Sequence, residues 1–265
     1  MIPFFISIPH SGEKVPTEAS WLLDFDEVTL MCDVDRYVDQ LYSSAIESLQ
    51  IPSVKTEWHR YVVDLNRWSD DVDVDSVEGS PNPSGRFTTG LHWVKTTTGV
   101  QLMRQPISKV LHQKLVEKYF QPFHAAVRSQ YSMFKEKGFQ NVYHLDAHSM
   151  PSQGTAAHRD PGTQRPQIVV SDCEGVSCRA DYKDLVIEAY KSAGFEVAYN
   201  WPYKGGRVTQ TYGKPSLGQQ ALQVELNRAL YMDEKTKQKN ERFSQTQGQI
   251  LKAIQIIQKE VALLK

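Results

Sequence analysis

The chain has 265 residues, 40% of them hydrophobic and 23% charged, a composition typical of a soluble globular protein with a sizeable core. Its formal net charge of −1, from 30 basic and 31 acidic residues, excludes an overall field that would attract nucleic acid or an anionic membrane. No stretch approaches the roughly 20 apolar residues of a membrane span, and three cysteines are too few for a disulfide framework. We expect one domain over residues 1–265 in the cytoplasm, with no nucleic-acid or membrane partner. A homo-oligomer stays open, because the long C-terminal helix could cover the core or a neighbour.

Apolar, β-branched segments predict strands at 4–8, 61–65, 141–147, 167–172, 195–200 and 221–226. Apolar residues at helical spacing predict helices at 36–49, 107–136, 180–193 and 234–264, with stops at Gly138 and Gly194. Residues 69–85 and 151–166 are rich in Asp, Ser, Pro and Gly or lack an apolar period, which predicts two long loops. Strands that alternate with helices predict an α/β fold with a mostly parallel sheet covered on both faces.

Two histidines, His10 and His148, each follow a run typical of a buried strand. The carboxyl ends of strands line the crevice where open α/β folds bind ligands, so the two imidazoles could share one site. A carboxylate from Asp33, Asp35 or Asp39 would complete the ligand set of a catalytic zinc, with one position left to water. The alternatives are ordinary loop histidines and acidic residues that cap a helix. Spacing alone does not choose among the three aspartates.

Other histidines and one aspartate lie near the second of these strings. Asp146 precedes His148 by two residues, so on a strand both face the same side, and Asp146 could orient a ligating imidazole. His144 shares that parity but lies deeper in the strand, which favours a packed core histidine. His158, in the loop that follows, could contact a substrate as part of a lid.

Polar side chains also surround the segment at 61–65. Arg67 carries a planar fork that suits a carboxylate, and Asn66 adds a donor and an acceptor. The structural alternative is an internal ion pair from Asp64 to Arg60 or Arg67.

Glu225 follows an apolar segment, where a glutamate facing the site is a candidate general base. A wholly helical segment would instead make it a surface residue. The paired Gly205 and Gly206 between aromatic and basic residues suit a substrate loop whose backbone comes close to a ligand.

Taken in order, six strings of this sequence resemble the N-formylglutamate amidohydrolase family: IPHSG, the D-x-x-x-D-x-L-Y helix, RYVVDLNR, D-x-H-S-M, PYKGG and LQVELNRALYMDE. The resemblance spans residues 3–234. It implies a mixed, mostly parallel sheet flanked by helices, resembling the zinc carboxypeptidase (phosphorylase/hydrolase-like) fold. It also implies removal of the formyl group from N-formyl-L-glutamate in histidine degradation, giving formate and L-glutamate.

Carried over by position, the resemblance makes His10, Asp35 and His148 metal ligands and Glu225 the group that activates water. Asn66 and Arg67 match a pair that holds a substrate carboxylate. Zinc is the default metal, although the ligand set also accepts cobalt, manganese or iron.

N-Formylglutamate has two carboxylates, so it needs a second cation besides Arg67. The candidates are Arg86, Arg104, Arg207 and Arg228. Arg228, in the motif beside Glu225, is the first choice, and Arg104 is the second.

Three other readings remain open. An amidohydrolase of the same fold could act on another N-acyl amino acid or a short peptide, because pocket residues decide specificity. A non-catalytic protein could bind acidic amino-acid derivatives. A cysteine nucleophile at Cys173 or Cys178 has no adjacent histidine string. The segments 69–80 and HRDPG depart from the family pattern and leave the details of the substrate open.

Overall fold

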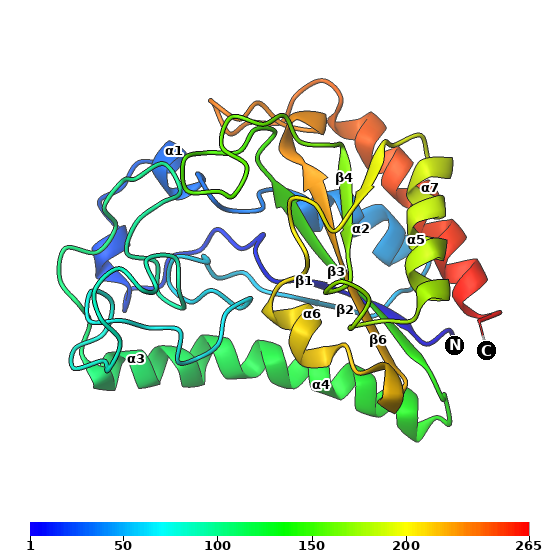
Figure 1. Cartoon of the computed structure of the whole chain (residues 1–265), viewed down its shortest axis with the longest axis horizontal. Helices are drawn as coiled ribbons and strands as arrows, with labels where there is room; N and C mark the ends of the chain where they lie inside the picture. Colours follow the sequence, from blue (N-terminus) through cyan, green and yellow to red (C-terminus); the bar gives the residue numbers. More distant parts are fainter. Residues whose placement is uncertain (265) are drawn as a thin grey trace.

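Six strands form one sheet in the computed structural model, which describes residues 1–264 (Figure 1). The order across the sheet is β2-β1-β3-β6-β4-β5. The strands are β1 (Phe4–Ile8), β2 (Ser53–Lys55), β3 (Val142–Met150), β4 (Ile168–Ser171), β5 (Val197–Tyr199) and β6 (Gln219–Asn227). Five of them coincide with predicted strands, and β2 was not predicted because it is only three residues long and half exposed.

Strand direction divides the sheet into two parts. Strands β2, β1, β3 and β6 are parallel, whereas β4 pairs antiparallel with β6 and parallel with β5. The predicted mixed, mostly parallel sheet is therefore confirmed. Strands β1, β3 and β6 have their carboxyl ends at one edge, where the register places His148 opposite Glu225.

Helices cover both faces of this sheet (Figure 1). Helices α2, α5 and α7 pack on one face, in a core that includes Ile6, Leu145 and Val224. Helices α3 and α4, joined by the π-helical turn η2, cover the other face with α6. The helices are α1 (Glu27–Leu30), α2 (Val38–Ser48), α3 (Lys109–Leu115), η2 (Val116–Phe120), α4 (Gln121–Glu136), α5 (Ala180–Ser192), α6 (Arg207–Tyr212) and α7 (Phe243–Val261), with 3-10 turns η1 (Ser20–Leu22), η3 (Pro215–Leu217) and η4 (Arg228–Leu230). No helix within residues 1–264 has both the length and the apolar character of a membrane span.

Local signals explain where two of these helices end. Gly138 and Gly194 adopt positive φ angles of 88° and 96° just beyond α4 and α5. A left-handed residue after the last helical turn favours glycine, because glycine has no Cβ. Both predicted stops are confirmed.

The predicted strand at 61–65 is wrong. Val62, Val63 and Leu65 are buried, but the segment belongs to turns rather than to the sheet. The hydrogen bonds of Asp64 fold the segment into turns. Its backbone N–H donates to the carbonyl of Leu91, and its side chain accepts from the backbone N–H of Asn66. The apolar side chains of this segment pack in the second hydrophobic core, so they are buried without any pairing of the segment into a β-sheet.

The last predicted helix begins nine residues later than expected, at Phe243 rather than at residue 234. Asp233 accepts hydrogen bonds from the backbone N–H groups of Lys235 and Thr236, and Lys237 has a φ of 60°. These features form a turn that a helix cannot continue through. The predicted loops at 69–85 and 151–166 contain no regular helix or strand.

Candidate active site

Three chain segments meet at the carboxyl edge of β1 and β3. His10 lies two residues beyond β1, and His148 lies near the end of β3. Asp35 precedes α2, and its backbone N–H donates to the carbonyl of His10 at 3.0 Å. The sheet places the two histidines side by side, and this backbone bond brings the aspartate to them.

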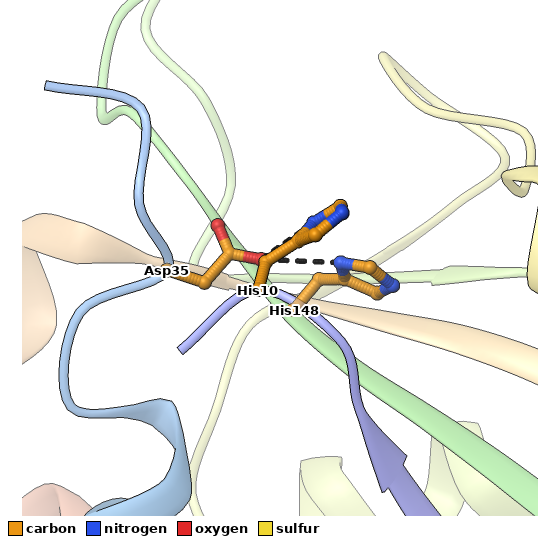
Figure 2. A group of neighbouring side chains, drawn as sticks. All are labelled: His10, Asp35 and His148. Atoms are coloured by element: carbon orange, nitrogen blue, oxygen red, sulfur yellow. Dashed lines mark hydrogen bonds and ion pairs between the residues drawn. The ribbon is translucent and has the colours of Figure 1, made fainter. Parts of the chain in front are cut away.

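The side chains of His10, Asp35 and His148 form a buried cluster (Figure 2). Asp35 Oδ2 lies 3.4 Å from His10 Nδ1 and 3.1 Å from His148 Nδ1. One ligand atom from each residue lies within 4.8 Å of the other two. The group could therefore hold one metal ion.

Each imidazole is held from behind by a buried carboxylate. His10 Nε2 lies 2.8 Å from Asp64 Oδ1, and His148 Nε2 lies 2.8 Å from Asp146 Oδ2. Burial opposes the charge on both carboxylates, but the neighbouring His10 and His148, respectively, lower their pKa values. Because an ionised carboxylate only accepts, each imidazole donates Nε2–H, and in its neutral form it keeps a lone pair on Nδ1 that a metal can use.

Those two lone pairs test whether a metal fits. Both Nδ1 atoms face Asp35 Oδ2, which is itself an acceptor, and His10 Nδ1 is buried without a hydrogen-bond partner. Three acceptors that converge on one point repel one another unless a cation lies between them. Two imidazoles and one carboxylate are also the ligand set of a catalytic zinc. The cluster therefore fits a divalent metal.

The electrostatics of the cluster indicate the same preference for positive charge. Burial opposes protonation of His148, but the carboxylates of Asp146 and Asp35 outweigh it and raise its pKa well above the usual value. Burial likewise opposes ionisation of Asp35, but His10 and His148 lower its pKa well below the usual value. Both shifts favour positive charge between these three side chains.

The second oxygen of Asp35 is fixed separately. Asp35 Oδ1 accepts from Arg228 Nη2 at 3.1 Å and from Ser149 Oγ at 3.2 Å. Arg228 also donates to Ser149 Oγ and to the carbonyls of Cys32 and Asp33, so it uses four of its five N–H groups internally. Arg228 holds Asp35 so that Oδ2 remains directed at the two histidines.

Glu225 lies on β6 and lines the same cavity as the cluster. Its Oε1 accepts from Gln223 Nε2 at 2.6 Å, and Gln223 Oε1 in turn accepts from the backbone N–H of Gly206 at 2.7 Å. Burial raises the pKa of Glu225 to about 7, with Asp35 adding to the rise and His148 and Arg228 opposing it. A carboxyl group that titrates near neutral pH can both take and return a proton.

The cavity has a volume of about 310 Å³ and includes most of the predicted substrate-binding residues. Asn66, Arg67, Gly205, Gly206 and Arg228 all line it. The exposed Arg104 does not line it.

The neighbouring candidates have other partners. Asp33, which spacing alone could not separate from Asp35, accepts from Tyr61 OH at 2.6 Å and from Thr97 Oγ1 at 2.5 Å and is outside the cluster. His144 is buried in the core, where its ring bonds to Ser7 Oγ at 2.6 Å. His158 lines the cavity.

Sequence reasoning missed several residues of the site. It considered Asp64 only as an ion-pair partner. The pair with Arg60 is present at 2.9 Å, but Asp64 also holds His10. Gln223 could have been found, because it precedes Glu225 by two residues on a strand and so shares its face. Arg159, which lines the cavity from the loop at 151–166, carries no pattern that marks it.

A substitution at Gly206 tests how tightly this part of the cavity wall packs against Asn66. A Cβ there would lie 2.0 Å from Asn66 Nδ2, and Asn66 is held by a 2.7 Å hydrogen bond from the backbone N–H of Val208. We expect Gly206→Ala to lower the free energy of unfolding by about 1–3 kcal/mol, measured by urea denaturation. Gly248→Ala, on α7 with open space around it, should leave stability unchanged or raise it by up to about 1 kcal/mol. Equal stability of Gly206→Ala and the wild type would contradict this packing.

Comparison with known proteins agrees with the geometry. Residues 2–232 match the model of the N-formylglutamate amidohydrolase family. An N-formylglutamate deformylase from Pseudomonas aeruginosa is 29% identical over 238 residues, covering 88% of this chain and 83% of that protein. The crystal structure of N-formylglutamate amidohydrolase from Ralstonia eutropha JMP134 superposes with a TM-score of 0.86 at 28% identity, covering 98% of this chain and 94% of the other.

A gene product from Agrobacterium tumefaciens shares the fold at 15% identity, with a TM-score of 0.73 and coverage of 98% of this chain and 92% of the other. Because the family model matches nearly the whole length, the chain belongs to the N-formylglutamate amidohydrolase family.

Proposed function

We propose that the protein is a metal-dependent hydrolase that cleaves the formamide bond of N-formyl-L-glutamate to formate and L-glutamate. The observation that carries the proposal is the buried His10–Asp35–His148 cluster facing the same cavity as Glu225. Relatives that are 28–29% identical and carry the name of this reaction support the choice of substrate. The compact cavity also suits a small substrate.

In this proposal His10, Asp35 and His148 hold a divalent cation, by default zinc. When bound there, such a cation supplies Lewis-acid chemistry, which polarises a carbonyl and makes water more acidic. The chain contributes the orientation of the ligands: Asp64 and Asp146 hold the two imidazoles, and Arg228 holds the carboxylate.

Glu225 acts as general base and then as general acid. It takes a proton from the water whose oxygen bonds to the formyl carbon, and it returns the proton to the nitrogen as the C–N bond breaks. A pKa raised to about 7 by burial suits both steps. The second proton of the water, released as formic acid ionises, is taken up by the amine, so the products are formate and L-glutamate with a protonated amino group, and atoms and charge balance.

Arg67 and Asn66 bind one substrate carboxylate in this scheme. Arg67 donates Nε–H to the carbonyl of Thr89 at 2.8 Å and Nη1–H to the carbonyl of Asn66 at 3.1 Å, which fixes the guanidinium at the cavity wall. Its Nη2 makes no hydrogen bond with residues 1–264 and is available to a carboxylate. The backbone at Gly205 and Gly206 forms the adjacent wall.

The product, L-glutamate, suits a role in amino-acid breakdown, and we propose that the protein acts in histidine degradation. Cys32, Cys173 and Cys178 are free, in accord with the reducing cytoplasm that we propose as its compartment.

Formate release before and after chelation tests the function. We expect about one metal ion per chain, formate release from N-formyl-L-glutamate, its loss after chelation, and its recovery when zinc, cobalt or manganese is added back. If the protein binds a metal tightly but cleaves only another N-acyl amino acid or a short peptide, the fold and the metal site stand and the substrate is that other compound. Protein that binds no metal and remains active would contradict the ligand assignment.

A further inference from the structure

The cations that line the cavity differ in how far the protein already uses them. They are Arg60, Arg67, Arg159, Lys204 and Arg228. Arg60 is paired with Asp64 at 2.9 Å, and Lys204 is paired with Glu174 at 2.6 Å. Arg228 is occupied by Asp35 and by three other acceptors. Three of the five cations are therefore committed to internal partners.

The remaining two cations, Arg67 and Arg159, have donors to spare. Arg67 is anchored by two backbone carbonyls, through Nε and Nη1, and Nη2 is left over. Arg159 is exposed at the rim of the cavity and has no hydrogen bond or ion pair with any part of the chain that the structure describes. A substrate with two carboxylates requires two such cations.

The loop that carries Arg159 is firmly anchored on both sides of it. Asp160 and Arg165 are buried and form a bidentate ion pair with two N···O distances of 2.8 Å, and Arg165 also donates to Tyr203 OH at 3.0 Å. On the other side, Thr155 Oγ1 donates to the carbonyl of Thr97 at 3.2 Å. These contacts hold the neighbourhood of Arg159 against the cavity.

His158, directly before Arg159, adds a neutral donor. Its Nδ1 accepts from the backbone N–H of Thr155 at 3.0 Å, so the ring proton of the neutral imidazole lies on Nε2. Burial lowers the pKa of His158, which favours this neutral form. The loop thus presents a guanidinium and an N–H group from adjacent residues that both line the cavity.

We propose that Arg159, assisted by His158, binds the side-chain carboxylate of the substrate and selects acidic over neutral N-acyl amino acids. This inference rests on the proposed function. The backbone N–H of Arg67 donates to the carbonyl of Asp64 at 3.2 Å, and the side chain of Asp64 bonds to His10, so Arg67 lies on the metal side of the cavity. The α-carboxylate is attached to the carbon beside the reacting nitrogen and therefore belongs to Arg67. The side-chain carboxylate extends two carbons further, toward the rim and Arg159.

The test compares N-formyl-L-glutamate with N-formyl-L-glutamine, which has the same shape but no charge on its side chain. We expect Arg159→Gln to lower kcat/KM for N-formyl-L-glutamate by about 30-fold, mainly through KM, because a charge-assisted hydrogen bond is lost. For N-formyl-L-glutamine the same variant should change kcat/KM by less than about 3-fold. Arg159→Lys should recover part of the loss, because it keeps the charge without the fork.

Matched variants separate this role from general charge effects. Arg67→Gln should lower kcat/KM for both substrates to a similar extent, since both keep the α-carboxylate. Lys252→Gln, which removes one positive charge from the exposed side of α7, should alter neither. If Arg159→Gln lowered kcat/KM equally for both substrates, or for neither, the assignment of Arg159 to the side-chain carboxylate would be overturned.

The two proposals fail in different ways. Wild-type protein that releases formate from neither substrate contradicts the proposed function. In that case the affinities of the wild type and of Arg159→Gln for N-formyl-L-glutamate and N-formyl-L-glutamine are measured by calorimetry. A loss of affinity in the variant for the acidic compound alone supports the inference, and any other pattern overturns it.

Discussion

Asp35→Asn is expected to abolish stable metal binding and to lower kcat/KM for N-formyl-L-glutamate by at least about 10³-fold. The reason is that Asp35 Oδ2 is the point on which His10 and His148 converge, and it supplies the only negative charge of the proposed ligand set. The amide keeps the shape of the side chain, so contacts with Arg228 and Ser149 through the other oxygen can persist. The measurement is the metal content after dialysis, together with the rate of formate release.

Asp33→Asn is the matched control, because Asp33 is two residues away and also lines the cavity. Its carboxylate bonds to Tyr61 and Thr97 rather than to either histidine. We expect this variant to retain its metal after the same dialysis. Loss of metal from Asp33→Asn together with retention by Asp35→Asn would reverse the choice between the two aspartates.

Glu225→Gln is expected to lower kcat by about 10³-fold while metal content and KM stay close to those of the wild type. Glutamine preserves the size of the side chain and can still pair with Gln223, but it cannot take a proton from water. The measurement is steady-state kinetics of formate release, with the metal content determined on the same sample. Retention of more than a tenth of the wild-type kcat would remove Glu225 from the proposed mechanism.

The pH dependence follows from the same carboxyl group. Burial raises the pKa of Glu225 to about 7, and a general base acts only when it is deprotonated. The wild-type kcat/KM should therefore rise with pH on the acid side, and a bound divalent cation moves this limb below about 7 because positive charge favours the carboxylate. The residual activity of Glu225→Gln should lack this limb.

The parts of the site that lie on strands could be predicted from sequence. His148 and Asp146 follow from period-2 alternation and from the fact that the ends of parallel strands meet at one edge. The same reasoning placed His10 just beyond β1. These predictions needed only local patterns and one general rule about sheets, whereas the role of Glu225 came from the family resemblance.

Loop residues were much harder to place. The segment at 61–65 has the composition of a strand, yet the hydrogen bonds of Asp64 to His10, Arg60 and Trp93 fold it into turns. Arg228 stands in the motif beside Glu225, which made it the first choice for a substrate carboxylate, but its donors are directed to Asp35 and to backbone carbonyls. Contacts of this kind join residues far apart in the chain, and no spacing in the sequence encodes them.

Strand β6 is the last strand in the sequence, yet it lies between β3 and β4 in the sheet. While the chain is being synthesised, β3 and β4 emerge first and have no strand to join them, so each presents an edge of unpaired N–H and C=O groups. The sheet can therefore close only late in synthesis, through pairings that are distant in sequence and slow to form. Because β6 carries Glu225, the proposed base reaches the site only when this last strand pairs with its neighbours.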